Sequence, residues 1–206
     1  TLGGQYNVAH DPADNPIPNS DIKITNNKIS GWGDSGIRLR EGTHDVWVAR
    51  NCVFANGTFE DPTTGDGISI EDSFSNLVEY NTANSNYSNG IRLRNAQANT
   101  VKHNTANNNG NTGNADPGSN NGILVEGGSA NNLIFHNTTY RNGNFLTSVG
   151  DGIRVRRSAG LRVAVDRDRL RDRERGGCGD GLDARAQYRE LDDIGAVAGA
   201  VGVGVE

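Results

Sequence analysis

Short runs of alternating apolar and polar residues recur along the chain. A phrase of Gly, Ile, any residue, an aliphatic residue and any residue occurs five times, at 36–40, 67–71, 90–94, 122–126 and 152–156. The two apolar residues of each phrase are two positions apart, so they share one face of a short strand while their neighbours project from the other face. The pattern therefore predicts five similar strands, each with one buried face.

A second motif follows each of the first four phrases. It consists of apolar residues followed by Asn, at 48–51, 78–81, 101–104 and 134–137. The tightest repeat, from Gly67 to Gly90, covers about two dozen residues, which suits one coil of three short strands. The longer repeats contain polar, Gly-rich insertions directly before the next Gly-Ile step, at 57–65, 110–120 and 143–150. The insertions are therefore expected to be loops at one corner of the coil.

One coil cannot bury its apolar face alone, so stacked coils must share a core. The predicted core consists of Ile37, Ile68, Ile91, Ile123 and Ile153 beside Leu39, Ile70, Leu93, Val125 and Val155. A β-propeller would require antiparallel blades, and a leucine-rich repeat would require helix-like stretches with regular Leu; neither pattern is present. The sequence predicts an all-β parallel solenoid of about five to six coils.

One Asn per coil recurs at the same place: Asn27, Asn51, Asn81, Asn104 and Asn137. At a coil corner, Asn tolerates unusual backbone angles, and its amide can bond to the Asn above and below. We expect a structural ladder that satisfies backbone groups. An amide-lined ligand site is the alternative.

These Gly-Ile phrases and the Asn series resemble the right-handed parallel β-helix repeat family over about residues 21–156. That family includes pectate lyases, alginate lyases and epimerases, polygalacturonases, phage tailspikes and a periplasmic protein of copper-site maturation. The resemblance implies a secreted, cell-surface or periplasmic protein that binds an acidic polysaccharide and processes it as a lyase or epimerase. A non-catalytic structural solenoid and a copper-maturation role are the alternatives.

The composition divides the chain into three parts. A polar segment at 1–20 precedes the repeats at 21–156, and a tail at 157–206 is first rich in Arg and Asp and then in Gly, Ala and Val. One interpretation of the tail is a capping segment for the open end of the solenoid. The other is a shifted reading frame in a GC-rich gene, which predicts an irregular, disordered tail.

Charge and cysteine content limit the partners. The 206 residues carry a net charge of −5, and no apolar run approaches the length of a membrane span, so no membrane insertion is expected. Acidic residues interrupt the Arg-rich run at 162–175, which argues against nucleic-acid binding. Cys52 and Cys178 supply neither a disulfide framework nor a zinc site.

The outward face of the Gly-Ile strands carries most of the candidate chemistry. One column has alternating charges, Arg40, Glu71, Arg94, Glu126 and Arg156, and predicts a salt ladder between coils. The other column, Arg38, Ser69, Arg92, Leu124 and Arg154, contains no acid of its own. Six Arg against two Glu make the strip positive, which suits a uronic-acid polysaccharide. The expected substrate-binding residues are Arg38, Arg92, Arg94 and Arg154.

Catalysis on this face would require cationic groups beside a substrate carboxylate, as in β-elimination or C5 epimerisation, with Arg or Ca²⁺ neutralising that carboxylate. Asp34 and Asp66 precede the Gly-Ile phrases of adjacent coils, where they are either turn residues or ligands of Ca²⁺. His103 and His136 occupy equivalent positions and form either a surface stack or a copper or zinc site. The sequence assigns no catalytic residue.

Overall fold

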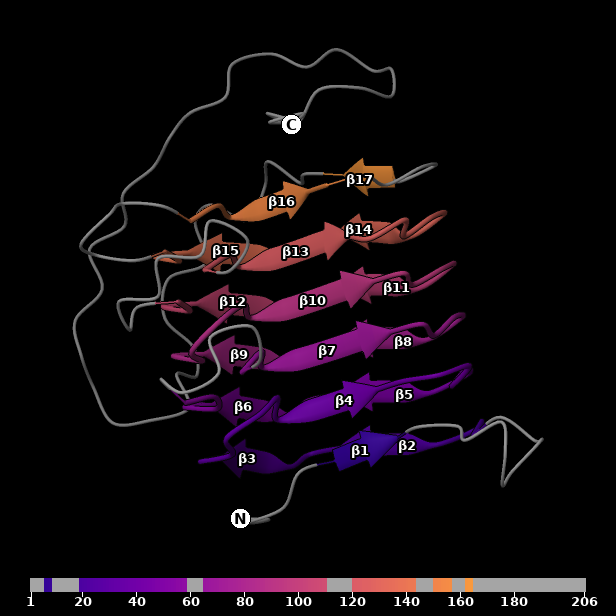
Figure 1. Cartoon of the computed structure of the whole chain (residues 1–206), viewed down its shortest axis with the longest axis horizontal. Coiled ribbons are helices and arrows are strands. Elements are labelled where there is room, and N and C mark those ends of the chain that lie inside the picture. The colour runs from indigo at the N-terminus through magenta and orange to yellow at the C-terminus, as the bar shows by residue number, and fades with distance from the viewer. Residues whose placement is uncertain are drawn as a thin grey trace.

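A computed structural model describes residues 6–8, 19–58, 65–110, 120–143, 150–156 and 162–164. The strands form three parallel sheets (Figure 1). Sheet A contains β1 (Tyr6–Val8), β4 (Ile37–Leu39), β7 (Ile68–Glu71), β10 (Ile91–Arg94), β13 (Ile123–Glu126) and β16 (Ile153–Val155). Sheet B contains β2 (Lys23–Thr25), β5 (Trp47–Ala49), β8 (Leu77–Glu79), β11 (Thr100–Lys102), β14 (Leu133–Phe135) and β17 (Arg162–Ala164). Sheet C contains β3 (Lys28–Ser30), β6 (Cys52–Phe54), β9 (Thr82–Asn84), β12 (Thr105–Asn107) and β15 (Thr138–Tyr140).

Each of the first five coils contributes one strand to each sheet, the described part of the sixth contributes β16 and β17, and equivalent strands stack directly upon one another (Figure 1). The Gly-Ile phrases form sheet A, in the predicted register: Ile91 pairs with Ile68 and Ile123, and Leu93 pairs with Ile70 and Val125. The apolar residues before the ladder Asn form sheet B, and a third strand after that Asn forms sheet C. The predicted parallel solenoid is confirmed.

The core runs through the centre of the stack. The Ile of β4, β7, β10 and β13 are fully buried, as are Leu39, Ile70, Leu93 and Val125. Ile153 and Val155 are partly buried and pack against the same cluster. Each coil buries its apolar face mainly against the coils above and below it, which is why the repeat must be stacked to be stable.

The predicted Asn ladder is present at the corner between sheets B and C. Asn51, Asn81 and Asn104 each donate a side-chain N–H to the amide oxygen of the next Asn at 3.0 Å. The positive φ at this corner belongs to the preceding residue, for example Tyr80 and His103 at 54°, and the Asn itself is not in this region. The expectation that Asn supplies the unusual backbone angle is therefore wrong, because its role is to bond inside the corner.

Two further Asn ladders occupy the other corners. One contains Asn76, Asn99 and Asn132, and the other contains Asn56, Asn86, Asn109 and Asn142. In both, the amide oxygens after the first accept hydrogen bonds from the backbone N–H and the side chain of the Asn on the preceding coil, while Asn76 and Asn56 accept from the backbone of Val46 and Trp32. The corners are thus held by side-chain bonds that the sheets themselves cannot supply.

The ends of the solenoid depart from two expectations. β17 pairs in parallel with β14, so sheet B continues beyond the predicted end at residue 156. The rest of 157–206, and most of 1–20, lies outside the described residues. Cys52 is disulfide-bonded, so the expectation that it has no partner is wrong. In the described part of the chain, no helix is long and apolar enough to cross a membrane.

Candidate functional site

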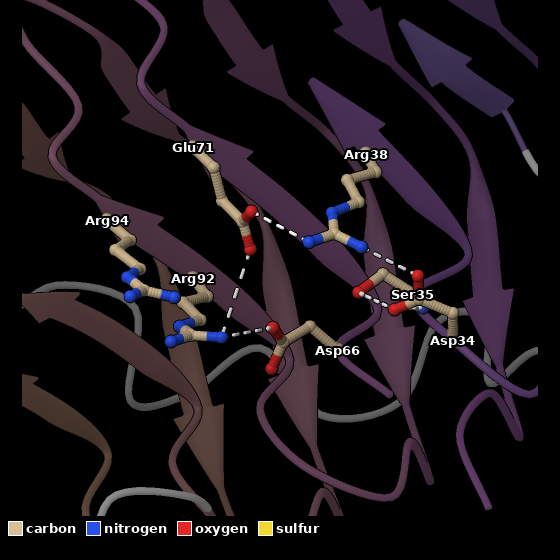
Figure 2. A pocket seen from close by; sticks show the side chains of 7 residues that line it. All are labelled: Asp34, Ser35, Arg38, Asp66, Glu71, Arg92 and Arg94. Carbon is tan, nitrogen blue, oxygen red and sulfur yellow. Dashed lines mark hydrogen bonds and ion pairs between the residues drawn. The ribbon is translucent and has the colours of Figure 1, made fainter. Parts of the chain in front are cut away.

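A small polar pocket lies on the outward face of sheet A, over β4, β7 and β10 (Figure 2). It has a volume of about 230 Å³, several times the roughly 30 Å³ occupied by one water in the liquid. Its lining residues are Asp34, Ser35, Arg38, Asp66, Glu71, Arg92 and Arg94. The pocket is therefore lined by three carboxyl groups, three guanidinium groups and a hydroxyl.

Arg38 and Arg92 are held in place by acidic neighbours. Arg38 donates to Asp34 at 2.7 Å and to Glu71 at 2.8 Å. Arg92 donates through Nε and Nη2 to Glu126 Oε1 at 2.9 and 2.6 Å. These side chains are 14 to 17% exposed, so their ion pairs are shielded from water and fix the guanidinium positions.

These contacts correct the expected charge pattern of the strip. Glu71 and Glu126 do stand beside Arg94 in the register, but they bond diagonally to Arg38 and Arg92 in the other column. The second column has no acid of its own, as predicted, and its acidic partners come from the first column, so diagonal pairs replace the predicted salt ladder at Glu71 and Glu126. A long Arg side chain reaches across one strand step to a neighbouring coil, so strand alternation alone does not fix which charges pair.

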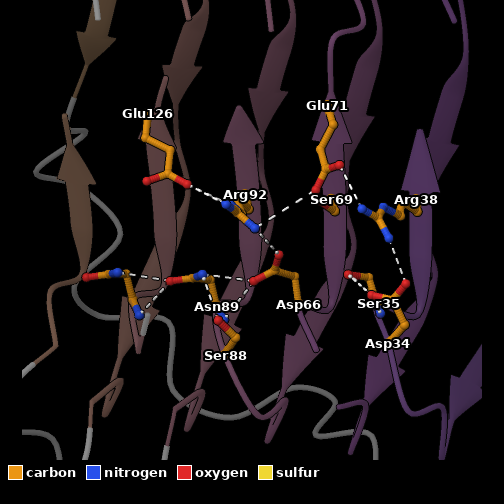
Figure 3. Close-up of polar contacts among 11 residues, drawn as sticks. Asp34, Ser35, Arg38, Asp66, Ser69, Glu71, Ser88, Asn89, Arg92 and Glu126 are labelled. Carbon is orange, nitrogen blue, oxygen red and sulfur yellow. Dashed lines mark hydrogen bonds and ion pairs between the residues drawn. The ribbon is translucent and has the colours of Figure 1, made fainter. Parts of the chain in front are cut away.

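Asp66 is the most buried charged residue of the pocket, with 1% exposure. Its Oδ1 accepts hydrogen bonds from Asn89 N at 3.0 Å and Asn89 Nδ2 at 2.8 Å. No described residue donates a hydrogen bond to its Oδ2, and Arg92 Nη1 lies 3.6 Å away (Figure 3). A buried carboxyl oxygen without a hydrogen bond costs stability, which singles out Asp66 among the lining residues.

Asp66 also ends a fourth ladder. Asn121 donates to Asn89 Oδ1 at 2.9 Å, and Asn89 donates to Asp66 in the same manner. On the preceding coil of the chain, Ser35 occupies the position equivalent to Asp66. Gly36 N donates to Asp66 O just as Gly67 N donates to Asn89 O. The expected match of Asp66 with Asp34 is thus off by one residue. The ladder stops where the pocket begins, and Asp66 faces the pocket in place of another amide.

The two central carboxyl groups have pKa values displaced in opposite directions. Burial raises the pKa of Asp66 above its ordinary value of 3.8, against the influence of Arg92 and Asn89. Burial alone would also raise the pKa of Glu71, but the hydrogen bond and charge of Arg38 hold it below 4.5. The neighbouring Asp66, Glu126 and Glu71 outweigh burial and raise the pKa of Arg92. The pocket thus favours the protonated form of Asp66 and the ionised form of Glu71 more than water does.

The remaining predicted binding residues occupy different settings. Arg94 is exposed, lines the pocket and forms no ion pair with any residue that the structure describes. Arg154 lies on β16, outside the pocket, with Nη1 at 3.7 Å from Asp151. The structure therefore brings Arg38, Arg92 and Arg94 together and leaves Arg154 further along the sheet.

The chain matches the family model described as "Right handed beta helix region" over residues 16–164. It belongs to the right-handed β-helix family. Comparisons with curated proteins and with solved structures give no significant match. Membership in the β-helix family thus accounts for the coils and the ladders, while the chemistry of the pocket must be argued from its own residues.

The expected metal ligands do not gather into a larger cluster in this β-helix. Within the described ranges, no group of three or more His, Cys, Asp or Glu is placed to hold a metal ion. Asp34 bonds to Arg38, and Asp66 lies near Arg92, so the two guanidinium groups would repel Ca²⁺ there. The rings of His103 and His136 have centroids 5.0 Å apart and are tilted by 37°, and Tyr80 stacks on His103 at 4.9 Å.

The sequence did not indicate that Asp66 and Glu71 line the same pocket. Glu71 was placed in a salt ladder, and Asp66 was considered as a turn residue or a Ca²⁺ ligand. The available signal was the column Ser35, Asp66, Asn89, Asn121 and Asp151, in which two amides give way to a carboxyl group. A ladder that only hydrogen-bonds to backbone groups would be expected to keep Asn in place of Asp66.

Replacing Asp66 with Asn is expected to stabilise this β-helix by about 1 to 2 kcal/mol at neutral pH, because it removes a buried carboxyl group and keeps the Oδ1 acceptor for Asn89. In the wild type, the native state binds the Asp66 proton more tightly than the unfolded chain does. The stability that this tighter proton binding gives the wild type is fully present below about pH 4. It is lost as pH rises through the pKa of Asp66 in the folded protein. The advantage of Asp66→Asn should therefore grow with pH.

Thermal unfolding at a series of pH values between about 3 and 8 measures this difference. Asp151→Asn is the matched control: Asp151 follows Asn121 in the same column, but its side chain is 55% exposed. Its effect should be small, because the charge that it removes is largely exposed. An Asp66→Asn variant that loses its advantage as pH rises would contradict the assignment.

Proposed function

We propose that this β-helix binds an acidic polysaccharide at the sheet A pocket, with Arg94 as the main contact to a sugar carboxylate. The observation that carries the proposal is the contrast between Arg94 and its neighbours. Arg38 and Arg92 are fixed by internal ion pairs, while Arg94 lies exposed at the pocket and pairs with no acidic group among the described residues. A guanidinium group in this setting is suited to pair with a planar carboxylate in bidentate fashion.

The surroundings of Arg94 support a saccharide rather than a simple anion. Asp34, Ser35 and Glu71 line the same pocket and supply hydrogen-bond acceptors and a hydroxyl, which complement the hydroxyl groups of a sugar. Arg154 lies two strands further along the same sheet, about 10 Å away at the usual strand spacing. A polymer lying along the stack would thus meet a second guanidinium beyond the pocket.

Two other functions make different predictions. A purely structural solenoid would bind no polyuronate, and its pocket charges would serve only to fix the register of the coils. A copper-maturation protein would bind copper through His103 and His136, which here form part of an aromatic stack. The pocket favours the polysaccharide, and with it the expectation that the protein works outside the cytoplasm.

Arg94→Ala should weaken binding of polygalacturonate or alginate about tenfold, because one charge-assisted contact is lost. Isothermal titration calorimetry at low and at physiological ionic strength measures the affinity, and salt should weaken the wild-type interaction. Lys28→Ala is the matched control, since it removes one positive charge from an exposed position on sheet C. Its affinity should stay near that of the wild type. The proposal fails if the wild type binds neither polymer, or if both variants lose affinity equally.

A further inference from the structure

The two oxygens of Asp66 have different surroundings. Oδ1 accepts hydrogen bonds from Asn89 N at 3.0 Å and from Asn89 Nδ2 at 2.8 Å. Oδ2 receives no hydrogen bond from any described residue, although Asp66 is only 1% exposed and lines the pocket (Figure 3). A proton on this carboxyl group therefore belongs on Oδ2, because two donors already occupy Oδ1. When it is protonated, Asp66 presents an O–H group to a ligand in the pocket.

The charges around Asp66 are balanced when Asp66 itself is neutral. The surrounding charged groups are the guanidinium groups of Arg38, Arg92 and Arg94 and the carboxylates of Asp34, Glu71 and Glu126. An ionised Asp66 gives this set one excess negative charge, and protonation removes that charge. An anionic ligand therefore meets less repulsion in the pocket when Asp66 is protonated.

The groups beside Oδ2 favour a ligand that accepts hydrogen bonds. Arg92 Nη1 lies 3.6 Å from Asp66 Oδ2, so one ligand oxygen can lie within about 3 Å of both atoms. Arg38 also lines the pocket, and its buried Nε has no hydrogen-bond acceptor among the described residues. A carboxylate supplies both the acceptor oxygens and the negative charge that these groups complement.

We propose that protonated Asp66 donates its Oδ2 hydrogen to the carboxylate of the bound sugar, so that the pocket takes up one proton together with the acidic ligand. This inference rests on the proposed binding function, in which Arg94 is the main contact to that carboxylate. The proton comes from solvent and returns to it when the ligand leaves, and no covalent bond of the ligand changes. Asp66 thereby helps the pocket to select an acidic ligand over a neutral one.

The affinity should consequently fall as pH rises. Burial raises the pKa of Asp66 above 3.8 in the free protein, and a bound carboxylate that shares the proton raises it further. Binding is strongest below the pKa of the free protein, weakens between the two pKa values and is constant above the pKa of the complex. Glu71 does not cause this change above about pH 5, because Arg38 holds its pKa below 4.5.

Isothermal titration calorimetry with polygalacturonate and with alginate, between about pH 5 and 8, measures this dependence while the sugar carboxylates stay ionised. The wild-type affinity should fall about tenfold across this range. Titrations in buffers with different ionisation enthalpies should show uptake of up to one proton per site.

Asp66→Asn is the variant that tests the assignment. Its Oδ1 still accepts hydrogen bonds from Asn89, and its Nδ2 donates into the pocket at every pH. The variant should show little pH dependence and no proton uptake, and near pH 8 it should bind about tenfold more tightly than the wild type. It is expected to be at least as stable as the wild type, so a loss of binding cannot come from unfolding.

Two controls accompany this variant. Asp151→Asn removes an acidic group from the same column and should keep the pH dependence of the wild type. Methyl-esterified polygalacturonate lacks the carboxylate, so any binding of that polymer should show no proton uptake.

The outcomes separate the two proposals. A wild-type affinity that does not change with pH, or an Asp66→Asn variant with the pH dependence of the wild type, would overturn the role of Asp66 and leave the binding proposal intact. The same holds if affinity rises with pH and Asp66→Asn binds more weakly, because an ionised Asp66 would then accept a hydrogen bond from a sugar hydroxyl. Failure of the wild type to bind either polymer would overturn both.

Discussion

Replacing Asn81 with alanine is expected to lower the free energy of unfolding by about 3 to 5 kcal/mol. The amide oxygen of Asn81 accepts hydrogen bonds from Asn51 N at 2.9 Å and Asn51 Nδ2 at 3.0 Å. Its own Nδ2 donates to Asn104 Oδ1 at 3.0 Å and to Val48 O at 2.9 Å. Alanine would remove all four bonds at a site only 1% exposed, where water cannot replace them.

Chemical denaturation followed by far-ultraviolet circular dichroism measures this loss. Asn27→Ala is the matched control, because Asn27 lies at the first coil of the same ladder and donates to Asn51 without being so deeply buried. Its effect should be smaller, near 1 kcal/mol. Equal losses for the two variants would show that ladder position does not govern the stability of the corner.

The regular part of the sequence predicted the fold well because its physical cause is local. Two apolar residues separated by one polar residue define a strand face, and the repeat states which strands are neighbours. Ile68, Ile91 and Ile123 could therefore be placed in register from spacing alone. The first Asn ladder was predicted for the same reason, because one Asn per coil at a fixed position indicates amides that bond to one another along the stack.

The site was less predictable because it depends on side-chain reach and on departures from the repeat. Both outward columns were identified, but the pairing of Glu71 with Arg38 is diagonal and cannot be read from strand alternation. The importance of Asp66 follows from burial and from the direction of its ladder, which sequence spacing does not reveal. The two further Asn ladders repeat at the same spacings as the predicted one, so their signal was present in the sequence but was not recognised.

The interruption of the fourth ladder at Asp66 lowers the stability of the molecule. Asn at this position would satisfy the Asn89 donors and would avoid a buried carboxyl group. Retaining Asp leaves Oδ2 without a hydrogen bond beside Arg92, at a cost to the free energy of folding. Groups held in this way are typical of sites where a reactive state is prepared in advance. A purely structural β-helix would give no reason for that cost.

Gly90→Ala is expected to destabilise the protein by about 3 kcal/mol or more, because the coils approach most closely at the Gly of each Gly-Ile phrase. A Cβ at position 90 would lie 2.7 Å from Gly122 O and 2.8 Å from both Ala106 Cβ and Asn109 Nδ2. The first contact is to backbone in the next coil, and the last is to a ladder amide that bonds to Asn142. Neither neighbour can move without breaking bonds that join the coils.

Gly33→Ala separates this steric cause from the general effect of losing a glycine. A Cβ at position 33 would meet only Thr58 Cγ2, at 3.5 Å, which is an ordinary contact. That variant should remain within about 0.5 kcal/mol of the wild type or be slightly stabilised, since alanine restricts the unfolded chain. Urea denaturation of both variants provides the comparison. Equal stability for the two would mean that the Gly of the repeat is not required by the spacing of the coils, and that the regular register of sheet A must have another origin.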